Sequence, residues 1–331
     1  MRLGSALVRA EARVIKSRPS RIAATVVSLV LALSGVSAAA HAQSAGNAVT
    51  EWNLIAMNTL VPFPPPAGGA PPAIQVHMGM VQGAVYDAVN ATEPRRRQPY
   101  LLDERFAPTA SKEAAVATAA YRVLSNIVST VPARIAFPNR ADLLQALDTA
   151  YDTSLAAIPD GPAKIEGIAA GDAAADAMIT AREEDGRFGP SPWKSNQDPG
   201  HWQPLLNPDG TQMLDPTPWG GGVRPFLIES ASQFRTDGPR VLSAETWATD
   251  FNEVKALGSV NSTARTPEQT HVAIWWQSAG GPTRLWNTVA RDLVNDPTYG
   301  IDIVESARLY AMMNLAAADA AITCWSEKYY W

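Results

Sequence analysis

Apolar residues recur every three to four positions along most of the chain, which is the period of an amphipathic helix. This spacing predicts nine helices. In chain order they cover residues 49–60, 74–91, 111–127, 140–157, 163–182, 244–257, 267–277, 282–295 and 301–331. No segment alternates apolar and polar residues over any length, and no internal repeat is found. The pattern therefore predicts an all-α fold, built as a helical bundle.

Two helix starts carry a recognisable cap. Ser111 precedes the third helix, with Glu113 in its first turn, and Thr266 precedes Pro267. Serine and threonine side chains accept hydrogen bonds from the free N–H groups of a first helical turn, and proline is tolerated at the first helical position. We expect Ser111 and Thr266 to be N-caps.

The segment from Gly186 to Pro225 interrupts the helical pattern. It holds Trp193, Trp202 and Trp219, several prolines and three consecutive glycines at 220–222. Loops of this length are unusual inside a compact domain, and its tryptophans argue against disorder. We expect a long Trp/Pro/Gly-rich loop that lies ordered across the helices.

Residues 1–42 have the pattern of a secretory signal peptide. Six basic residues between Arg2 and Arg21 precede an uncharged run over 22–40, and Ala40-His41-Ala42 fits the cleavage site. An uncleaved membrane anchor is the alternative, although Ala, Ser and Gly fill much of the run. We expect export to the periplasm or the medium, cleavage, no stable membrane insertion afterwards, and one domain over 43–331.

Charge and cysteine content exclude several function classes. The leader holds six of the 27 basic and one of the 32 acidic residues, so residues 43–331 carry 21 and 31, a net charge of −10. A nucleic acid is therefore not expected as a partner. Cys324 is the only cysteine, which excludes an intrachain disulfide, and the three remaining histidines show no zinc-binding spacing.

The last predicted helix carries the most informative pattern. Leu309, Met313, Ala317, Ala320, Ala321 and Cys324 form a stripe of apolar and small residues that Lys328 continues. A lysine in such a position either extends to solvent or binds an anion. Trp325, one turn earlier, either walls the same pocket or packs in the core. No glycine, asparagine or proline ends the helix before Trp331, so we expect the chain to be a fragment.

Other polar and aromatic residues have simpler structural interpretations. Asp172, Asp176 and Asp319 are expected to cap, to pair with arginine or to face solvent. His77 is expected to have a hydrogen-bonded structural role. The tryptophans at 275, 276 and 286 are expected in the core or in an interface.

The end of the chain resembles the vanadate-binding signature of the vanadium-dependent haloperoxidase and type 2 phosphatidic-acid phosphatase superfamily. The family pattern is a lysine, six residues and Arg-Pro, often with Ala-Asp-Ala before it and a tryptophan three residues before the lysine. Lys328 matches that lysine, Trp325 that tryptophan, and residues 318–320 read Ala-Asp-Ala. Residues 81–90, 200–204, 219–220, 224–226, 251–258 and 265–270 also resemble the bacterial branch, so the resemblance extends over most of residues 43–331.

The resemblance implies a helical bundle that holds vanadate, or phosphate in the phosphatases, among cationic and hydrogen-bonding side chains. Of these, the chain contains Lys328, and we expect the others beyond Trp331. The implied function is the oxidation of halide by hydrogen peroxide at bound vanadate, with small anions as partners. A phosphatase of the same superfamily and a non-catalytic exported helical protein are the alternatives. We expect residues 43–331 alone to bind vanadate poorly, to lack turnover, and to be poorly soluble or oligomeric.

Overall fold

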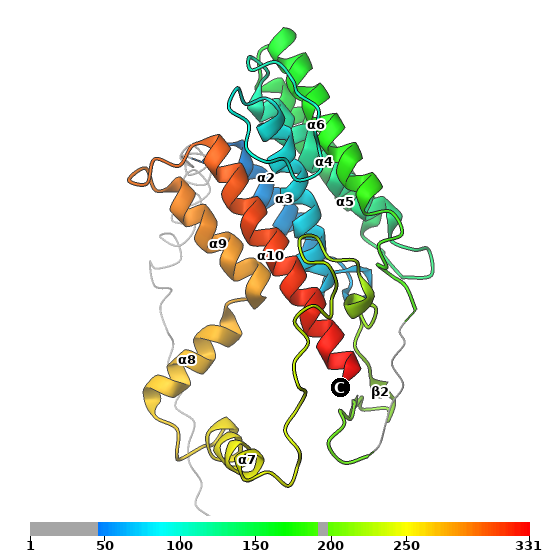
Figure 1. Ribbon diagram of the computed structural model, residues 1–331, viewed down its shortest axis with the longest axis vertical. Coiled ribbons are helices and arrows are strands. Elements are labelled where there is room, and N and C mark those ends of the chain that lie inside the picture. The colour runs from blue at the N-terminus through cyan, green and yellow to red at the C-terminus, as the bar shows by residue number, and fades with distance from the viewer. Residues whose placement is uncertain (1–45, 191–197) are drawn as a thin grey trace, which may run out of the picture. The chain divides into compact units, whose positions relative to one another are not determined.

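The computed structural model describes residues 46–190 and 198–331. The predicted signal peptide, residues 1–42, lies outside the described residues. Residues 45–331 form the second of the two units into which contacts divide the chain. In the second unit, Figure 1 shows helices joined by irregular segments. They are α2 (Ala48–Leu60), α3 (Ala73–Ala91), α4 (Lys112–Thr130), α5 (Arg140–Ala156), α6 (Pro162–Ala181), α7 (Glu245–Gly258), α8 (Pro267–Ser278), α9 (Gly281–Asn295) and α10 (Ile303–Tyr330), with short 3-10 helices η1 (Pro65–Ala67) and η2 (Gly220–Gly222). The all-α prediction is confirmed.

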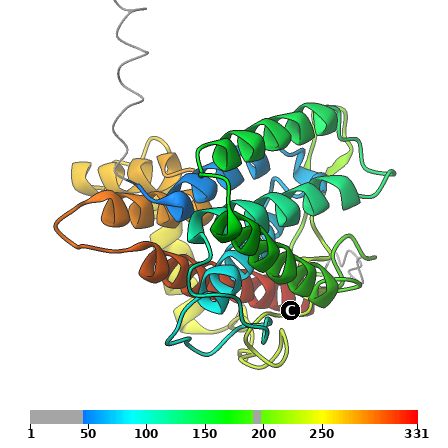
Figure 2. The same ribbon diagram turned by 90° about the horizontal axis from the view of Figure 1, so that it is seen from above.

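Helix α3 lies at the centre of the packed helices and contacts α2, α4, α6 and α10 (Figures 1 and 2). Every residue of α3 except Tyr86 is buried. Most of these residues are apolar and they lie on every face of the helix, so other segments must cover α3 on all sides, which explains its central position. Its methionines at 78 and 80 are among the largest fully buried side chains.

Small residues let neighbouring helices approach closely. On α6, a Cβ added at Gly171 would lie 2.6 Å from the carbonyl oxygen of Ala115 on α4, and one added at Gly167 would lie 2.3 Å from the carbonyl oxygen of Ser111. Only glycine fits at such contacts between a helix and a neighbouring backbone. The alanine- and glycine-rich face of α6 is therefore what sets the α4–α6 distance.

Both predicted N-caps are confirmed. Ser111 Oγ accepts a hydrogen bond from the Ala114 amide at 3.2 Å. Thr266 forms a capping box with Gln269, in which each side chain accepts a hydrogen bond from the other residue's backbone N–H. These contacts satisfy N–H groups that a helix cannot satisfy itself.

Helices α7 and α8 have no buried residue. Trp275 and Trp276 are 48% and 58% exposed, and Trp286 on α9 is 51% exposed. None of the three tryptophans lies in the core of the described residues, and their place in an interface stays a prediction. The reason is that helical spacing identifies an apolar side chain but does not identify what covers it.

In the described residues, the long loop packs on the helices at its start, through Phe188, and around its end. Trp219, Val223 and Phe226 are buried, whereas Trp202 is 52% exposed. Between them lies a small hairpin that the pattern did not predict, with β1 (Leu205–Leu206) antiparallel to β2 (Gln212–Met213). Trp193 lies outside the described residues.

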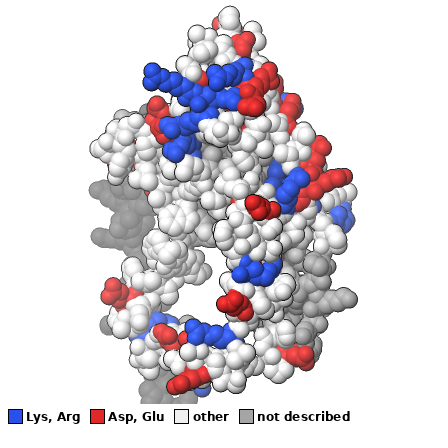
Figure 3. All heavy atoms as spheres, in the orientation of Figure 1, with Lys and Arg blue, Asp and Glu red and all other residues white. Residues whose placement is uncertain are grey.

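Within residues 46–190 and 198–331, no helix is both long and apolar enough to cross a membrane. On the face drawn in Figure 3, basic and acidic side chains lie beside one another.

Candidate functional site at the end of α10

Trp325 and Lys328 lie three residues apart on α10, which places them on neighbouring positions of one helix face. The Lys328 Nζ lies 3.9 Å from the centroid of the Trp325 ring. An ammonium over the face of an indole is attracted by the negative potential of the ring. Lys328 is exposed and Trp325 is half-buried, so the pair holds a positive charge at a defined place that solvent reaches.

The glycines of η2 pack directly on α10 beneath this pair. A Cβ added at Gly221 would lie 2.6 Å from the Ser326 nitrogen, and one added at Gly220 would lie 3.0 Å from Cδ1 of Trp325. A larger residue at either position would push the loop away from the helix. Gly220 and Gly221 therefore bring the loop against Trp325 and Ser326.

Asp215, on the same loop, fixes the tryptophan. Its Oδ2 accepts hydrogen bonds at 2.7 Å from Trp325 Nε1 and from the Tyr329 hydroxyl. Its Oδ1 accepts from the Thr217 amide at 2.8 Å. Burial, and then the hydrogen bond to the Asp215 carboxylate, raise the pKa of Tyr329. Tyr329 therefore stays protonated and keeps donating at neutral pH.

A second loop segment binds the other side of the helix end. Arg235 forms an ion pair with Glu327 at 3.0 Å, donates to Ser326 Oγ at 2.9 Å and lies 4.0 Å from the centroid of the Tyr330 ring. The hydrogen bond from the Thr236 hydroxyl lowers the pKa of Glu327. Because Arg235 is neutralised by Glu327, it adds no net positive charge near Lys328.

Lys328 itself has no carboxylate within ion-pair distance in the described part of the chain. A positive charge that is oriented but not neutralised is what an anion ligand requires. The sequence pointed to Trp325 and Lys328 and missed Asp215 and Arg235. These two lie in irregular loops about 90 to 110 residues from their partners, and no spacing rule connects them.

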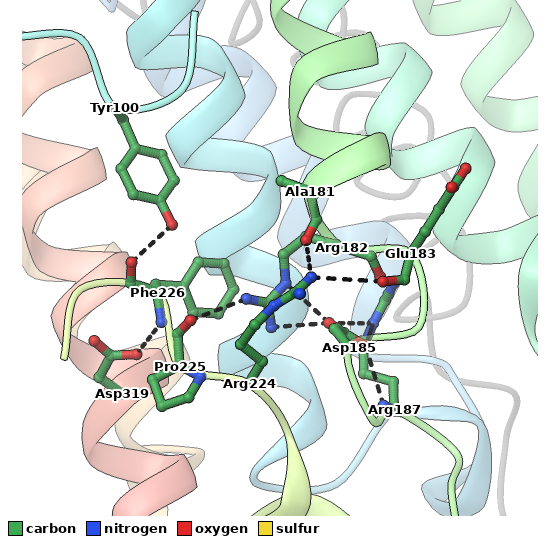
Figure 4. Close-up of polar contacts among 10 residues, drawn as sticks. All are labelled: Tyr100, Ala181, Arg182, Glu183, Asp185, Arg187, Arg224, Pro225, Phe226 and Asp319. Atoms are coloured by element: carbon green, nitrogen blue, oxygen red, sulfur yellow. Dashed lines mark hydrogen bonds and ion pairs between the residues drawn. The ribbon is translucent and has the colours of Figure 1, made fainter. Parts of the chain in front are cut away.

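A separate cluster of arginines joins the loop to α6 (Figure 4). Arg182 forms a buried ion pair with Asp185 at 2.8 Å and stacks on Phe226 at 3.9 Å from the ring centroid. Arg187 also binds Asp185, at 3.0 Å, and Arg224 donates to the Ala181 carbonyl. Burial lowers the pKa of Arg182. Arg182 and Arg187 also donate to the carbonyls of Pro225 and Arg182, so the cluster fastens the loop, and Arg187 Nη1 is buried without a hydrogen-bond partner.

Asp319 fastens the same loop to α10, as Figure 4 also shows. Its carboxylate accepts hydrogen bonds from the backbone N–H groups of residues 226, 227 and 228 at 2.6, 2.8 and 3.1 Å. These N–H groups belong to the loop and not to a helix start, so Asp319 has none of its three predicted roles. Asp172 and Asp176 both form ion pairs with Arg122, at 2.9 and 2.8 Å, which was among the predicted roles.

His77 departs from its predicted hydrogen-bonded role. The side chain is fully buried on α3, and neither Nδ1 nor Nε2 has a hydrogen-bond partner. Its ring lies among aromatic neighbours, with centroids 6.2 Å from Phe63 and 6.4 Å from Phe188. Burial, and secondarily the charge of Arg187, hold the pKa of His77 well below its usual value. His77 is therefore neutral near pH 7.

No protein-family model matches the chain. In sequence, it is similar to the vanadium chloroperoxidase of Curvularia inaequalis, with 26% identity over 170 residues, which is 42% of this chain and 27% of that protein. In structure, it is similar to a crystal structure described as the first bacterial vanadium-dependent iodoperoxidase, with a TM-score of 0.62 and 20% identity over 86% of this chain and 68% of the other.

The fold is that of the vanadium-dependent haloperoxidases. The resemblance read from the sequence is thereby confirmed. The chain spans about a quarter of the length of the curated chloroperoxidase that it matches.

Vanadate is an oxyanion, and the described residues fit one part of a site for it. Lys328 supplies a solvent-accessible ammonium that no carboxylate neutralises within the described residues, and Trp325 holds that ammonium in place. In the described residues, the nearby Arg235 is bound to Glu327. The role of both predicted residues in binding a haloperoxidase cofactor stays a prediction.

The stripe that led to Lys328 is not the buried face of α10. Ala321 is the one residue of the stripe that is buried, and the other buried residues of α10 are Ser306, Ala307, Tyr310, Ala311, Asn314, Leu315, Ala318, Asp319 and Ile322. Ala320 and Cys324 in the stripe are exposed, and Met313 and Ala317 are half-buried. Lys328 thus continues an open face of the helix, because the residues that pack on α3 are offset from the stripe.

Proposed function

We propose that these residues belong to an exported vanadium-dependent haloperoxidase-like enzyme, which oxidises halide with hydrogen peroxide at bound vanadate. The observation that carries the proposal is the uncompensated ammonium of Lys328 on α10, in a chain with the haloperoxidase fold. Both named relatives are vanadium peroxidases, which favours peroxidase over phosphatase chemistry.

In this proposal Lys328 is a ligand of the oxyanion and contributes fixed positive charge. The cation–π contact with Trp325 limits the positions of the ammonium, and Asp215 limits the orientation of Trp325. Vanadate, when bound, supplies the centre that activates hydrogen peroxide. Fixed charge that needs no rearrangement stabilises an anion and a developing negative charge more than a mobile group does.

Export is a further part of the proposal. Its support is the basic, apolar and small-residue order of residues 1–42, together with the acidic balance of residues 43–331. Small anions, namely halide, vanadate or phosphate, and hydrogen peroxide are the proposed partners.

The test is vanadate-dependent oxidation of iodide and bromide by protein expressed from the complete reading frame that contains these residues. We expect Lys328→Ala to lower kcat/KM by about 10²-fold or more, as loss of one preorganised donor does. Lys255→Ala is the matched control, because Lys255 is an exposed helical lysine on α7. Hydrolysis of p-nitrophenyl phosphate without any halide oxidation would refute the peroxidase assignment and favour the phosphatase.

A further inference from the structure

His77 lies in a closed cage on α3. Its ring centroid is 6.2 Å from that of Phe63 and 6.4 Å from that of Phe188, and a Cβ added at Gly68 would lie 2.5 Å from its Cε1. The side chain is fully buried, and neither nitrogen has a hydrogen-bond partner among the described residues. An imidazolium would need acceptors for two N–H groups and is far more costly to bury than a neutral ring. The closed cage therefore accommodates the neutral form of His77.

The charges beside the cage also oppose protonation of His77. Within the described residues, Arg187 is the one charged group whose field acts on it. Arg187 and Arg182 share the carboxylate of Asp185, so these three side chains have a net charge of +1 (Figure 4). The acidic residues at 183–184 of the same turn are exposed. A proton on His77 would thus meet a charge of the same sign.

The other elements around the cage supply no counter-charge. Residues 61–72, which form one wall, contain no titratable residue. On α3 itself the other titratable side chains are Tyr86 and Asp87, about 13–15 Å further along the helix. On the helices packed around α3, charged side chains are bound to other partners: Lys112 to Glu93, Arg122 to Asp172 and Asp176, and Asp319 to the loop backbone.

The turn at residues 186–188 closes the cage in a strained conformation. Phe188 has a φ of 59°, in the left-handed region that is unfavourable for a residue with a Cβ. Its ring packs on Trp219, with centroids 5.0 Å apart, and its carbonyl accepts a hydrogen bond from Arg134. A strained backbone persists only while its surroundings hold it, so loss of packing at Phe188 lets the turn relax.

The same turn packs on η2, which packs on the candidate site. A Cβ added at Gly186 would lie 2.5 Å from the carbonyl oxygen of Gly222, and one added at Gly220 would lie 3.0 Å from Cδ1 of Trp325. At such contacts neither backbone can shift alone. The cage of His77, the turn, η2 and Trp325 are therefore in continuous contact.

We propose that His77 is an acid-sensitive switch that holds the 186–188 turn, and through it η2, against α10 at neutral pH and releases both in acid. Both nitrogens are closed off from solvent, so the proton enters the form in which the turn has opened. Because the pKa of His77 is lowered in the closed form and returns to about 6.5 in the open form, the closed form is fully favoured above pH 6.5. Below it, the open fraction rises about tenfold per pH unit. The effect on Lys328 rests on the proposed function, and the opening of the turn does not.

The test is amide hydrogen exchange of the full chain at pH 7 and pH 5, corrected for the pH dependence of intrinsic exchange. The reporters are the Gly189 and Gly222 N–H groups, which donate to the Gly186 and Trp219 carbonyls at 3.1 and 2.9 Å. We expect both to exchange about tenfold or more faster at pH 5 in the parent and not in His77→Leu. Amides in the middle of α4 should keep their protection, because the opening is local.

Two further variants separate the switch from misfolding. His201→Leu, at an exposed histidine, is the matched control and should behave as the parent does. Phe188→Ala leaves His77 in place and removes the contact, so the Gly222 amide should exchange about tenfold faster already at pH 7. The proposal is wrong if the acceleration in acid persists in His77→Leu, or if Gly189 loses protection while Gly222 keeps it.

The link to the candidate site is tested with protein from the complete reading frame. Between pH 7 and pH 5, vanadate affinity should fall by a larger factor in the parent than in His77→Leu. Comparing the two proteins at the same pH cancels the protonation of vanadate itself. Equal falls would contradict the link. If neither protein binds vanadate at either pH, the proposed function is wrong, and hydrogen exchange still decides whether His77 releases the turn.

Discussion

Helices α3 and α8 carry equally clear helical signals in the sequence and differ completely in their surroundings. All residues of α3 but one are buried, and its start has no side-chain cap. In α8 no residue is buried, and its start has a complete capping box. Local signals and burial thus stabilise helices independently: α3 is held by packing on four other helices, and α8 is held by its own first turn and its contact with α9.

This difference predicts that truncating a large side chain destabilises the protein strongly in α3 and hardly at all in α8. Met80 on α3 is fully buried, and Ile274 on α8 is 61% exposed. Met80→Ala should lower the free energy of unfolding by about 2–5 kcal/mol, because it leaves a cavity in a packed core. Ile274→Ala should change it by less than about 0.5 kcal/mol. Denaturant unfolding of both variants measures the two values, and similar losses would contradict the contrast.

A smaller effect concerns the pH dependence that His77 gives to the α3 core. Its pKa is lowered in the folded state, so the unfolded state binds the proton more readily below pH 6.5. The contribution of His77 to stability is therefore complete above pH 6.5 and is lost as the pH falls. The loss is at most about 1.4 kcal/mol per pH unit. We expect Tm to fall less between pH 7 and 5 in His77→Leu than in the parent.

The histidine prediction has its own control in the loop region. His201 lies in the exposed part of the loop, so His201→Leu should leave the pH dependence of the parent unchanged. A His77→Leu variant whose Tm falls as steeply as that of the parent would show that other groups cause the acid sensitivity.

How much of the fold the sequence could predict depends on whether the signal lies in neighbouring residues or in distant segments. The helix ranges and the Ser111 and Thr266 caps followed from residues close together in the chain, and the structure confirms them. Which tryptophans are buried did not follow, because burial depends on distant segments. Trp219, in the irregular loop, is buried, and Trp275, in a predicted helix, is half exposed, the reverse of what helical spacing alone suggests.

The residues of the candidate site likewise divide into those that the sequence could predict and those that it could not. Trp325 and Lys328 could be predicted because their spacing on one helix and the family signature both lie within a few residues. Asp215 and Arg235 could not, because each reaches α10 from a loop through a contact that spans about 90 to 110 residues. For His77 the sequence predicted a hydrogen-bonded role, which is wrong, since no pattern in a sequence states that a buried nitrogen remains unbonded.

The most direct test of the central claim is the affinity for vanadate of the protein from its complete reading frame, with Lys328 or with Lys328→Ala. The account predicts that the alanine variant binds vanadate at least about tenfold more weakly, because one charge-assisted hydrogen bond to the oxyanion is lost. The Lys255→Ala control should bind as the parent does. Equal vanadate affinity in the parent and Lys328→Ala proteins would contradict the assignment of Lys328 as an oxyanion ligand.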